Sequence, residues 1–385
     1  FRDHVLRHGG RKSVLERAGT LLAGADLRQA AEDARRDPPR LVTHDRTGAR
    51  IDEVRFNAGY HRLIETGLEL GYASVPWDGS AGGHVTHAGL VYLMSQVEPG
   101  VCCPMTMTYA AIPALAADAA LLDAWRPKLA SARYDPAIAP VGAKQAATMG
   151  MAMTEKQGGS DVRANTTRAE PDGDVYRLTG HKWFCSAPMS DGFLTLAQAP
   201  GGLTCFVVPR WLDEGRNRIH IVRLKDKLGN VANASAEIEY DGAVAHRLGD
   251  EGDGVRRIID MVHHTRLDTA MAPVGLMRAA LAEAHHWALG RTVFQRRLID
   301  QPLMRAVLAD LTLDWEAALA LALRAARAFD DPAERAFARI AVALAKFYNN
   351  KRCGPVVAEA MEALGGVGYV EETPLPMLYL SLIHI

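Results

Sequence analysis

Residues 153–162 read Met-Thr-Glu-Lys-Gln-Gly-Gly-Ser-Asp-Val, and this stretch decides the fold of the 385-residue chain. The Gly158-Gly159 pair lets the backbone approach a ligand closely, because glycine lacks a Cβ atom and readily adopts positive φ. The hydroxyl groups of Thr154 and Ser160 and the free N–H groups of such a turn suit phosphate or carbonyl oxygens. A lone Gly-Gly-Ser turn is more often a polar hairpin loop, so the functional interpretation depends on the segments that accompany it.

The composition is that of an ordinary globular protein. Hydrophobic residues make up 48% of the chain and charged residues 23%, which allows a core of good size. At roughly 150 residues per domain, the length predicts two or three domains. A net charge of −1 gives no global basic field for nucleic acid or a membrane surface.

The five cysteines indicate a reducing compartment. Their number is odd, Cys102 and Cys103 are adjacent, and none forms a Cys-x-x-Cys pair. This pattern argues against a disulfide framework and against a zinc site. No signal peptide and no apolar run of membrane-spanning length is visible in the sequence. We therefore expect a cytoplasmic protein with no metal and no membrane partner.

The sequence at both ends of the chain is unusual for a complete natural protein. The first residue is Phe1 rather than methionine, and an apolar tail with no partner pattern, residues 380–385, follows Tyr379. We expect truncation at both ends and treat the tail as a non-native extension outside the fold.

The hydrophobic pattern divides the chain into three regions. Helical spacing dominates the first region, as in Val54–Leu70 and Leu90–Gln96. Short β-branched and aromatic segments follow, with a hairpin turn at Asp172-Gly173. Long amphipathic segments then return. The sequence predicts a mainly α, multidomain α+β protein: a helical N-terminal domain (1–148), a central antiparallel β-barrel or sandwich (149–250) and a C-terminal antiparallel helical bundle (251–379).

The C-terminal region predicts three long helices, over Val255–Ala288, Pro302–Phe329 and Pro332–Leu364. Pro302 and Pro332 stand where a proline in the first turn of a helix is tolerated, and Gly365-Gly366 stops the last helix. Three antiparallel helices need a fourth to close a bundle, and we expect that partner beyond Tyr379.

A second constellation lies in Gly180–Pro188. An aromatic strand end followed by a hydroxyl group, as in Phe184 and Ser186, can lay a ring against a planar cofactor and offer it a hydrogen bond. The alternative is a buried aromatic strand with a surface turn.

Two further motifs follow in the helical region. Arg291, near Phe294 and ten residues before Gln301, suits a phosphate, although an arginine at a helix end is favourable without any ligand. Gly365-Gly366-Val367-Gly368 lets backbone approach a pyrophosphate or adenine, but it is also an ordinary helix end.

In this order, the four motifs resemble those of the acyl-CoA dehydrogenase flavoproteins, and the Lys-Gln-Gly-Gly spelling of the first resembles the AidB-type, adaptive-response branch. The resemblance covers the chain from about Leu41 to Tyr379. It implies the helical, β, helical domain order and FAD as cofactor. It assigns the flavin contacts to Met153, Thr154, Gly158, Gly159, Ser160, Val162, Phe184, Ser186, Ala187, Arg291, Phe294, Gln301, Gly365 and Gly366.

Three departures from the family pattern stand out. Ala187 replaces the usual asparagine, Gln295 replaces a glycine, and Glu362 stands where many members have glutamine. In the family, the segments matching Arg291 and Gly365-Gly366 serve the FAD of a neighbouring subunit. The resemblance therefore implies a homotetramer built as a dimer of dimers.

The implied activity is oxidation of the CH–CH group next to the thioester of an acyl-CoA, which needs a carboxylate base with a raised pKa. In most of the family this base lies past the segment of Tyr369, and the isovaleryl-type branch places it where this chain has Thr265. Nothing assigns Glu371 or Glu372 to the role. We expect the base to lie beyond the C-terminal end, so that this chain binds flavin poorly and turns over slowly.

Two alternatives remain open. One is an AidB-type protein of the DNA-alkylation response, in which DNA associates with a basic C-terminal extension and dehydrogenation is minor. DNA is then a partner only of the full-length protein, since the net charge of this chain offers no substitute. The other is a binding module that kept the fold and lost the cofactor.

Overall fold

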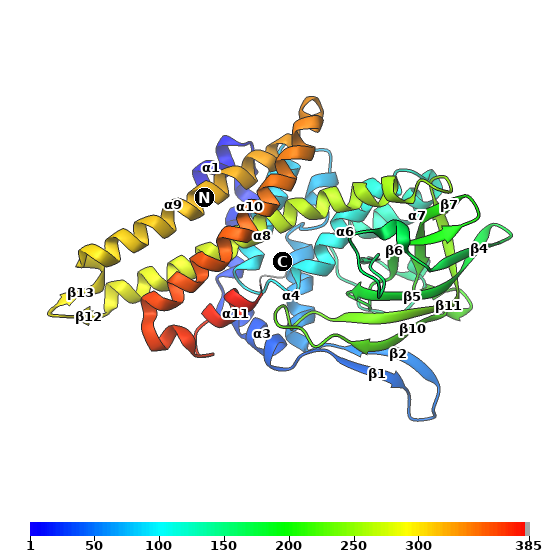
Figure 1. Cartoon of the computed structure of the whole chain (residues 1–385), viewed down its shortest axis with the longest axis horizontal. Helices are drawn as coiled ribbons and strands as arrows, with labels where there is room; N and C mark the ends of the chain where they lie inside the picture. Colours follow the sequence, from blue (N-terminus) through cyan, green and yellow to red (C-terminus); the bar gives the residue numbers. More distant parts are fainter. Residues whose placement is uncertain (382–385) are drawn as a thin grey trace.

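The computed structural model describes residues 1–381. Helices fill the left and centre of Figure 1, and the main sheet lies at the right. The N-terminal region forms helices α1 (Arg2–Arg7), α2 (Lys12–Leu22), α3 (Ala25–Arg36), α4 (Ala58–Glu69), α5 (Gly83–Ser95), α6 (Cys102–Leu115) and α7 (Ala119–Leu129), with 3-10 turns η1 (Val75–Trp77) and η2 (Val141–Ala143).

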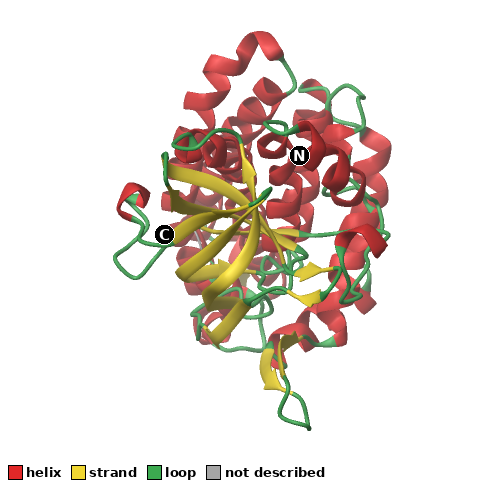
Figure 2. Cartoon of the chain, turned by 90° about the vertical axis from the view of Figure 1, so that its right-hand side faces the viewer, coloured by secondary structure: helices red, strands yellow, loops and turns green. Residues whose placement is uncertain are grey.

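A hairpin that the sequence did not predict interrupts these helices. Strands β1 (Arg40–His44) and β2 (Arg50–Arg55) pair antiparallel and project from the lower edge of the molecule (Figure 2). The helix expected from Val54 therefore begins at Ala58, after Asn57, whose side chain caps it by accepting from Gly59 N at 2.8 Å. Val54 belongs to β2, and the helical period expected there was wrong.

The central sheet closes on itself. Its strands are β3 (Met149–Ala152), β4 (Arg168–Asp172), β5 (Val175–Ser186), β6 (Gly192–Ala199), β7 (Gly202–Pro209), β10 (Ile219–Leu224) and β11 (Ser235–Leu248). They run in the order β10-β11-β7-β6-β3-β5-β4, and β11 also pairs with β5, which closes the barrel. The pairings are antiparallel except β3–β6 and β4–β6, so the sheet is mixed. The hairpin expected at Asp172-Gly173 is confirmed, with Gly173 at φ +62°.

The remaining short elements are the 3-10 turns η3 (Val162–Ala164), η4 (Leu298–Asp300), η5 (Pro332–Glu334) and η6 (Gly365–Tyr369) and the strand pairs β8 (Trp211–Leu212) with β9 (Gly215–Arg216) and β12 (Thr292–Val293) with β13 (Arg296–Arg297).

Three long helices dominate the C-terminal region, as predicted: α8 (Gly254–Gly290), α9 (Pro302–Phe329) and α10 (Arg335–Leu364), followed by α11 (Leu375–Leu380). Gly365 ends α10 at φ +66°. α8 contacts α9 and α10 and also α5 and α6. The N-terminal helices thus pack on α8 as well, and the fourth bundle helix expected beyond Tyr379 stays a prediction.

The C-terminal end of the described chain contains the first two residues of the expected tail. Leu380 ends α11 and Ser381 is buried, with its hydroxyl 3.3 Å from Asn230 N. Residues 382–385, the rest of that tail, lie outside the described residues. No helix of the described chain has the length and hydropathy needed to cross a bilayer.

Candidate functional site

The loop of residues 153–162 is fastened to β5 by a buried ion pair. The Glu155 carboxylate lies 2.8 Å from Lys182 Nζ, and both side chains are fully buried. It also accepts from Thr167 Oγ1 at 2.6 Å and from Thr166 N at 2.7 Å. Burial raises the pKa of Glu155, but the Lys182 ammonium and the threonine donors outweigh it and hold that pKa well below its usual range. Glu155 is therefore an ionised anchor of the loop and not a proton acceptor.

The two glycines of the loop answer two different needs. Gly158 has φ +119°, which side-chain-bearing residues rarely adopt, and its N–H donates to Glu155 O at 3.0 Å. Gly159 lies so close to Thr154 that a Cβ atom there would come within 2.6 Å of the threonine Oγ1. Ser160 is exposed beside them. The tight turn inferred from the sequence is confirmed, and its contact with a ligand stays a prediction.

The ends of the loop are held by backbone acceptors. Met153 O accepts from Asn165 Nδ2 at 2.9 Å, and Thr154 O accepts from Trp183 N at 2.7 Å. Val162 opens η3 and is half-buried. The bond between Thr154 and Trp183 thus places the loop, with its predicted flavin-binding residues, against the end of β5.

The end of β5 presents an exposed ring and a half-buried hydroxyl. Phe184 is 45% exposed, and Lys225 Nζ lies 4.7 Å from its ring centroid. Ser186 is half-buried. Ala187 follows at φ +51° and donates to Ala234 O at 2.9 Å. Asparagine tolerates this left-handed conformation better than alanine, which gives a physical reason for the asparagine that the resembling family has there.

Ser186 opens onto a cavity of about 230 Å³ between the sheet and the helices. Met151 of β3, Thr106 of α6 and Thr265 and Asp268 of α8 line it with Ser186. Segments that are far apart in the sequence therefore share one cavity. The Thr265 hydroxyl donates to Val262 O at 3.0 Å, so it is engaged within its own helix.

The carboxylate at this cavity is Asp268, which belongs to a buried network. Its Oδ1 lies 2.7 Å from His87 Nε2, and its Oδ2 accepts from Thr106 Oγ1 at 2.5 Å and from Tyr72 Oη at 3.2 Å. His87 Nδ1 lies 2.7 Å from Tyr72 O, a carbonyl that only accepts. Nδ1 therefore carries a hydrogen, and one more proton lies between His87 and Asp268, whichever of the two holds it.

The other predicted flavin contacts lie elsewhere. Arg291, Phe294 and Gln301 belong to the segment around β12 and β13, which Figure 1 shows at the end of the molecule away from the sheet. Phe294 is 93% exposed at φ +49°. Gln301 Nε2 donates to Val293 O at 3.1 Å. The single chain does not bring this group to the loop of residues 153–162.

Gly365 and Gly366 are exposed at the end of α10, and a Cβ atom at either would meet nothing within 4 Å. Gln295, at φ +64°, holds a conformation that glycine adopts more easily, which matches the glycine found there in the resembling family. Gly365, Gly366 and Gln295 are all exposed in the described chain, so a ligand or another chain can reach them.

Sequence reasoning missed the network of His87 and Asp268. An acidic residue within the apolar run from Leu267 to Met271 was the signal that could have found Asp268. Its partner stands on α5, 181 positions earlier, and no motif links the two.

Three family models match successive parts of the chain. They are the adaptive response protein AidB N-terminal domain over residues 1–136, the acyl-CoA dehydrogenase middle domain over 150–243 and the acyl-CoA dehydrogenase C-terminal domain over 252–382.

Individual proteins agree with these matches. The chain is 46% identical to the putative acyl-CoA dehydrogenase AidB of Escherichia coli K12, over 96% of this chain and 70% of that protein. The structure of Caenorhabditis elegans ACDH-11 in complex with C11-CoA has a TM-score of 0.86 and 32% identity, and the match covers 92% of this chain and 63% of that one. The Bd2924 apo-form gives a TM-score of 0.90 and 31% identity, over 99% and 80% of the two chains.

Proposed function

The chain belongs to the AidB-type branch of the acyl-CoA dehydrogenase family, and on that basis we propose that it is an FAD-dependent oxidoreductase acting on the CH–CH group of an acyl-CoA thioester. The observation that carries the proposal is that the glycine loop is bonded to the end of β5, which exposes the Phe184 ring, and that Ser186 of the same strand end lines a cavity with α6 and α8. ACDH-11, whose solved complex contains C11-CoA, supports the substrate class.

The residues present fit a flavin. Gly158 and Gly159 leave the loop without side chains where a cofactor approaches, Phe184 offers a ring face, and Ser186 offers a donor. FAD, when bound, supplies the hydride acceptor. The task of this chain is then to hold the loop rigid through Glu155 and to orient the acyl group in the cavity beside Thr265.

We propose further that none of the carboxylates described here is the base. Glu155 is held ionised by Lys182. Asp268 already meets His87, Thr106 and Tyr72. A catalytic base instead needs a carboxylate that is free to take up a proton.

The remaining candidates are Glu371 and Glu372. Both line a different cavity, beside Arg35 and Arg36. This placement supports a base outside residues 1–381.

The direct test is turnover of the 385-residue chain itself. We expect weak FAD retention and dye-coupled oxidation of acyl-CoA near background. A yellow protein with stoichiometric FAD and clear turnover would refute the proposal about the base while supporting the proposed activity. Absence of flavin binding in a longer native protein would instead favour a module without cofactor.

We propose a homotetramer, a dimer of dimers, in which the segment around Arg291 serves the FAD of another copy. Two observations support it: the predicted flavin contacts fall into two distant groups, and α9 and α10 expose apolar side chains at Leu313, Ile340, Leu344 and Phe347. Light scattering at several concentrations tests this, and a monomeric mass in a protein that retains FAD would contradict it.

We also propose a division into an N-terminal helical domain (residues 1–148), a central β domain (149–250) and a C-terminal helical bundle (251–379). The AidB-type match over residues 1–136 supports the alternative function, a role in the DNA-alkylation response. Mobility-shift titration of the full-length protein with duplex DNA at physiological salt separates the two functions. Binding there, with none by this chain of net charge −1, would favour the DNA-associated function.

A further inference from the structure

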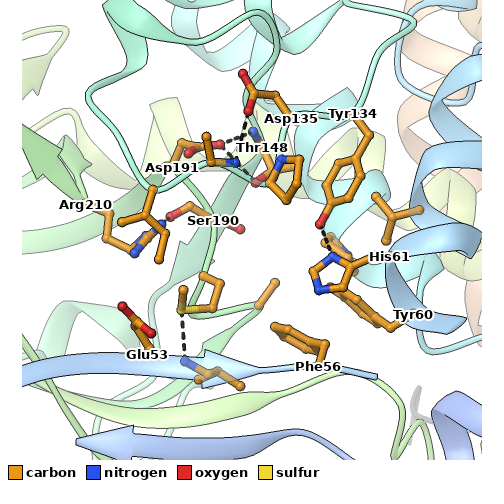
Figure 3. Close-up of a pocket in the computed structure, with 18 of the residues that line it drawn as sticks. Glu53, Phe56, Tyr60, His61, Tyr134, Asp135, Thr148, Ser190, Asp191 and Arg210 are labelled. Atoms are coloured by element: carbon orange, nitrogen blue, oxygen red, sulfur yellow. Dashed lines mark hydrogen bonds between the residues drawn. The ribbon is translucent and has the colours of Figure 1, made fainter. Parts of the chain in front are cut away.

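A second cavity, of about 420 Å³, lies behind the wall that carries Ser186. It is open to solvent on one side and is lined by β2, α4, α6 and the residues that follow β5 (Figure 3). Ala187 and Pro104 line this cavity, while their neighbours Ser186 and Cys103 line the cavity of about 230 Å³. The two cavities therefore lie back to back, and the function proposed above uses only the smaller one.

One side of the larger cavity is aromatic. The rings of Phe56 and Tyr60 are stacked, with centroids 4.0 Å apart and planes at 12°. His61 and Tyr134 continue this wall, with His61 Nδ1 2.7 Å from Tyr134 Oη. Ile64 adds apolar surface beside them. Such a wall suits a planar or branched apolar group.

The opposite side carries the mostly buried Arg210, whose guanidinium has no counter-ion in the described part of the chain. Arg210 is 8% exposed, and its Nε donates to Ser190 O at 3.0 Å. Within residues 1–381, its terminal nitrogens have no hydrogen-bond partner, and no carboxylate lies within 4.0 Å of them. Burial lowers the pKa of Arg210, while Asp191 and Glu53 act to raise it. The terminal nitrogens are not among the fully buried atoms, so they keep accessible surface that a bound anion can reach.

A second observation points to the same place. Ser190 is 2% exposed, and its Oγ is buried with no partner among the described residues. Buried polar atoms without partners are rare. In this conformation Ser190 Oγ has almost no accessible surface, so a bound carboxylate would meet it only after rotation of the Ser190 side chain. Figure 3 shows Ser190 and Arg210 on the side of the cavity opposite His61 and Tyr134.

The charges around the cavity select the anion. Lys144 is neutralised by Asp191 at 2.6 Å, with both side chains buried, so its ammonium is not available. Glu53 also lines the cavity but is paired with Arg55 at 3.9 Å. Asp135 lines it as well and would repel a dianion such as a phosphate monoester more strongly than a monoanion. One unpaired guanidinium among these carboxylates suits a single negative charge.

From these contacts we propose that the cavity binds a small monocarboxylate with an aromatic or branched apolar body, its carboxylate on Arg210 and Ser190 and its body on the Phe56, Tyr60 and His61 wall. This inference does not rest on the proposed dehydrogenase function. It makes the chain a carrier of two ligands on opposite faces of the Ser186-Ala187 segment.

The test is calorimetric titration of the purified chain with 3-phenylpropanoate, its neutral amide and phenyl phosphate. We expect the acid to bind roughly 10- to 100-fold more tightly than the amide, as for a hydrogen bond to a charged group. Phenyl phosphate should bind more weakly than the acid. Equal affinities of acid and amide, or no binding of the acid up to about 10 mM, would overturn the proposal.

Variants locate the site. Arg210→Gln should reduce the affinity for the acid to that for the amide, whereas Arg218→Gln, the same charge change on an exposed residue that lies outside the cavity, should leave both unchanged. Should Arg210→Gln fail to fold, Ser190→Ala decides. This variant should leave the melting temperature of the free protein unchanged or higher, because it removes an unpartnered hydroxyl. It should also lower the affinity for 3-phenylpropanoate by roughly 3- to 10-fold. Unchanged affinity in Ser190→Ala, or equal losses in Arg210→Gln and Arg218→Gln, would contradict the site.

Discussion

The two halves of the predicted flavin site differ in what holds them. The half formed by the loop of residues 153–162 and the end of β5 is locked by buried partners, above all Glu155 and Lys182. The half around Arg291 and Phe294 lies at the far end of the helices, and both of these side chains are exposed. The first half is shaped by folding. The second half is exposed, so its side chains can contact a ligand or another chain.

This difference predicts opposite responses to substitution. Residues of the locked half should affect stability and cofactor binding together. Residues of the exposed half should affect cofactor binding alone, because a surface side chain contributes little to the free energy of unfolding.

The largest effect is expected from Lys182→Met. The substitution leaves the buried Glu155 carboxylate without its counter-ion, and loss of one partner of a buried pair typically costs about 3–5 kcal/mol. Urea unfolding followed by circular dichroism measures it. The matched control is Lys156→Met, an exposed lysine in the same loop, for which we expect a change within about 0.5 kcal/mol. Similar small changes in both variants would show that the loop is not locked by this pair.

The next effect concerns Asp268, beside the locked half. Asp268→Ala removes the acceptor of Thr106 and Tyr72 and the partner of His87, and we expect a loss of about 2–3 kcal/mol from the buried groups left unpaired. Asp268→Asn should lose less than about 1 kcal/mol, because its amide can donate to a neutral His87 while its oxygen still accepts from Thr106. An asparagine variant as unstable as the alanine variant would mean that the negative charge itself is required.

A smaller effect is expected within the loop. Gly158→Ala should destabilise by about 1 kcal/mol, because alanine does not easily hold φ +119° and no neighbour lies within 4 Å to confuse the result. Gly19→Ala is the matched control. Gly19 also has no neighbour within 4 Å but lies inside α2, where alanine should stabilise by about 0.5–1 kcal/mol. Thermal unfolding of the pair measures both, and a stabilised Gly158→Ala would remove the backbone argument for the turn.

The same contrast explains what the sequence could reveal. The turn at Gly158 and the position of Ser186 at the end of β5 were predictable because both signals are local: a turn that needs glycine, and a hydroxyl next to an aromatic strand. The helices around Pro302 and Gly365 were found because proline and glycine mark helix ends.

Features that depend on distant partners stayed hidden. Asp268 meets His87 only through the packing of α8 on α5. Arg210 is a surface-type residue in the sequence, and only folding buries it against Ser190. The β1–β2 hairpin was missed because the apolar spacing from Val54 onward also fits a helix. Periodicity over such a short run does not separate the two structures.

The smallest effect on stability, and the sharpest test of the comparison, is expected from Arg291→Ala. The residue is exposed and forms no ion pair among the described residues, so the free energy of unfolding should change by less than about 0.5 kcal/mol. FAD retained after gel filtration should nevertheless fall, with affinity weakened by roughly 10- to 100-fold if the guanidinium meets a phosphate of a neighbour's cofactor. The weak basal FAD binding expected here makes a longer native chain the right background for this variant. Arg296→Ala, on the same exposed hairpin, controls for loss of charge and should leave FAD binding unchanged. Equal losses of FAD affinity in the two variants would mean that the exposed half acts only through its general positive charge. No loss in either variant would mean that only the locked half binds the flavin.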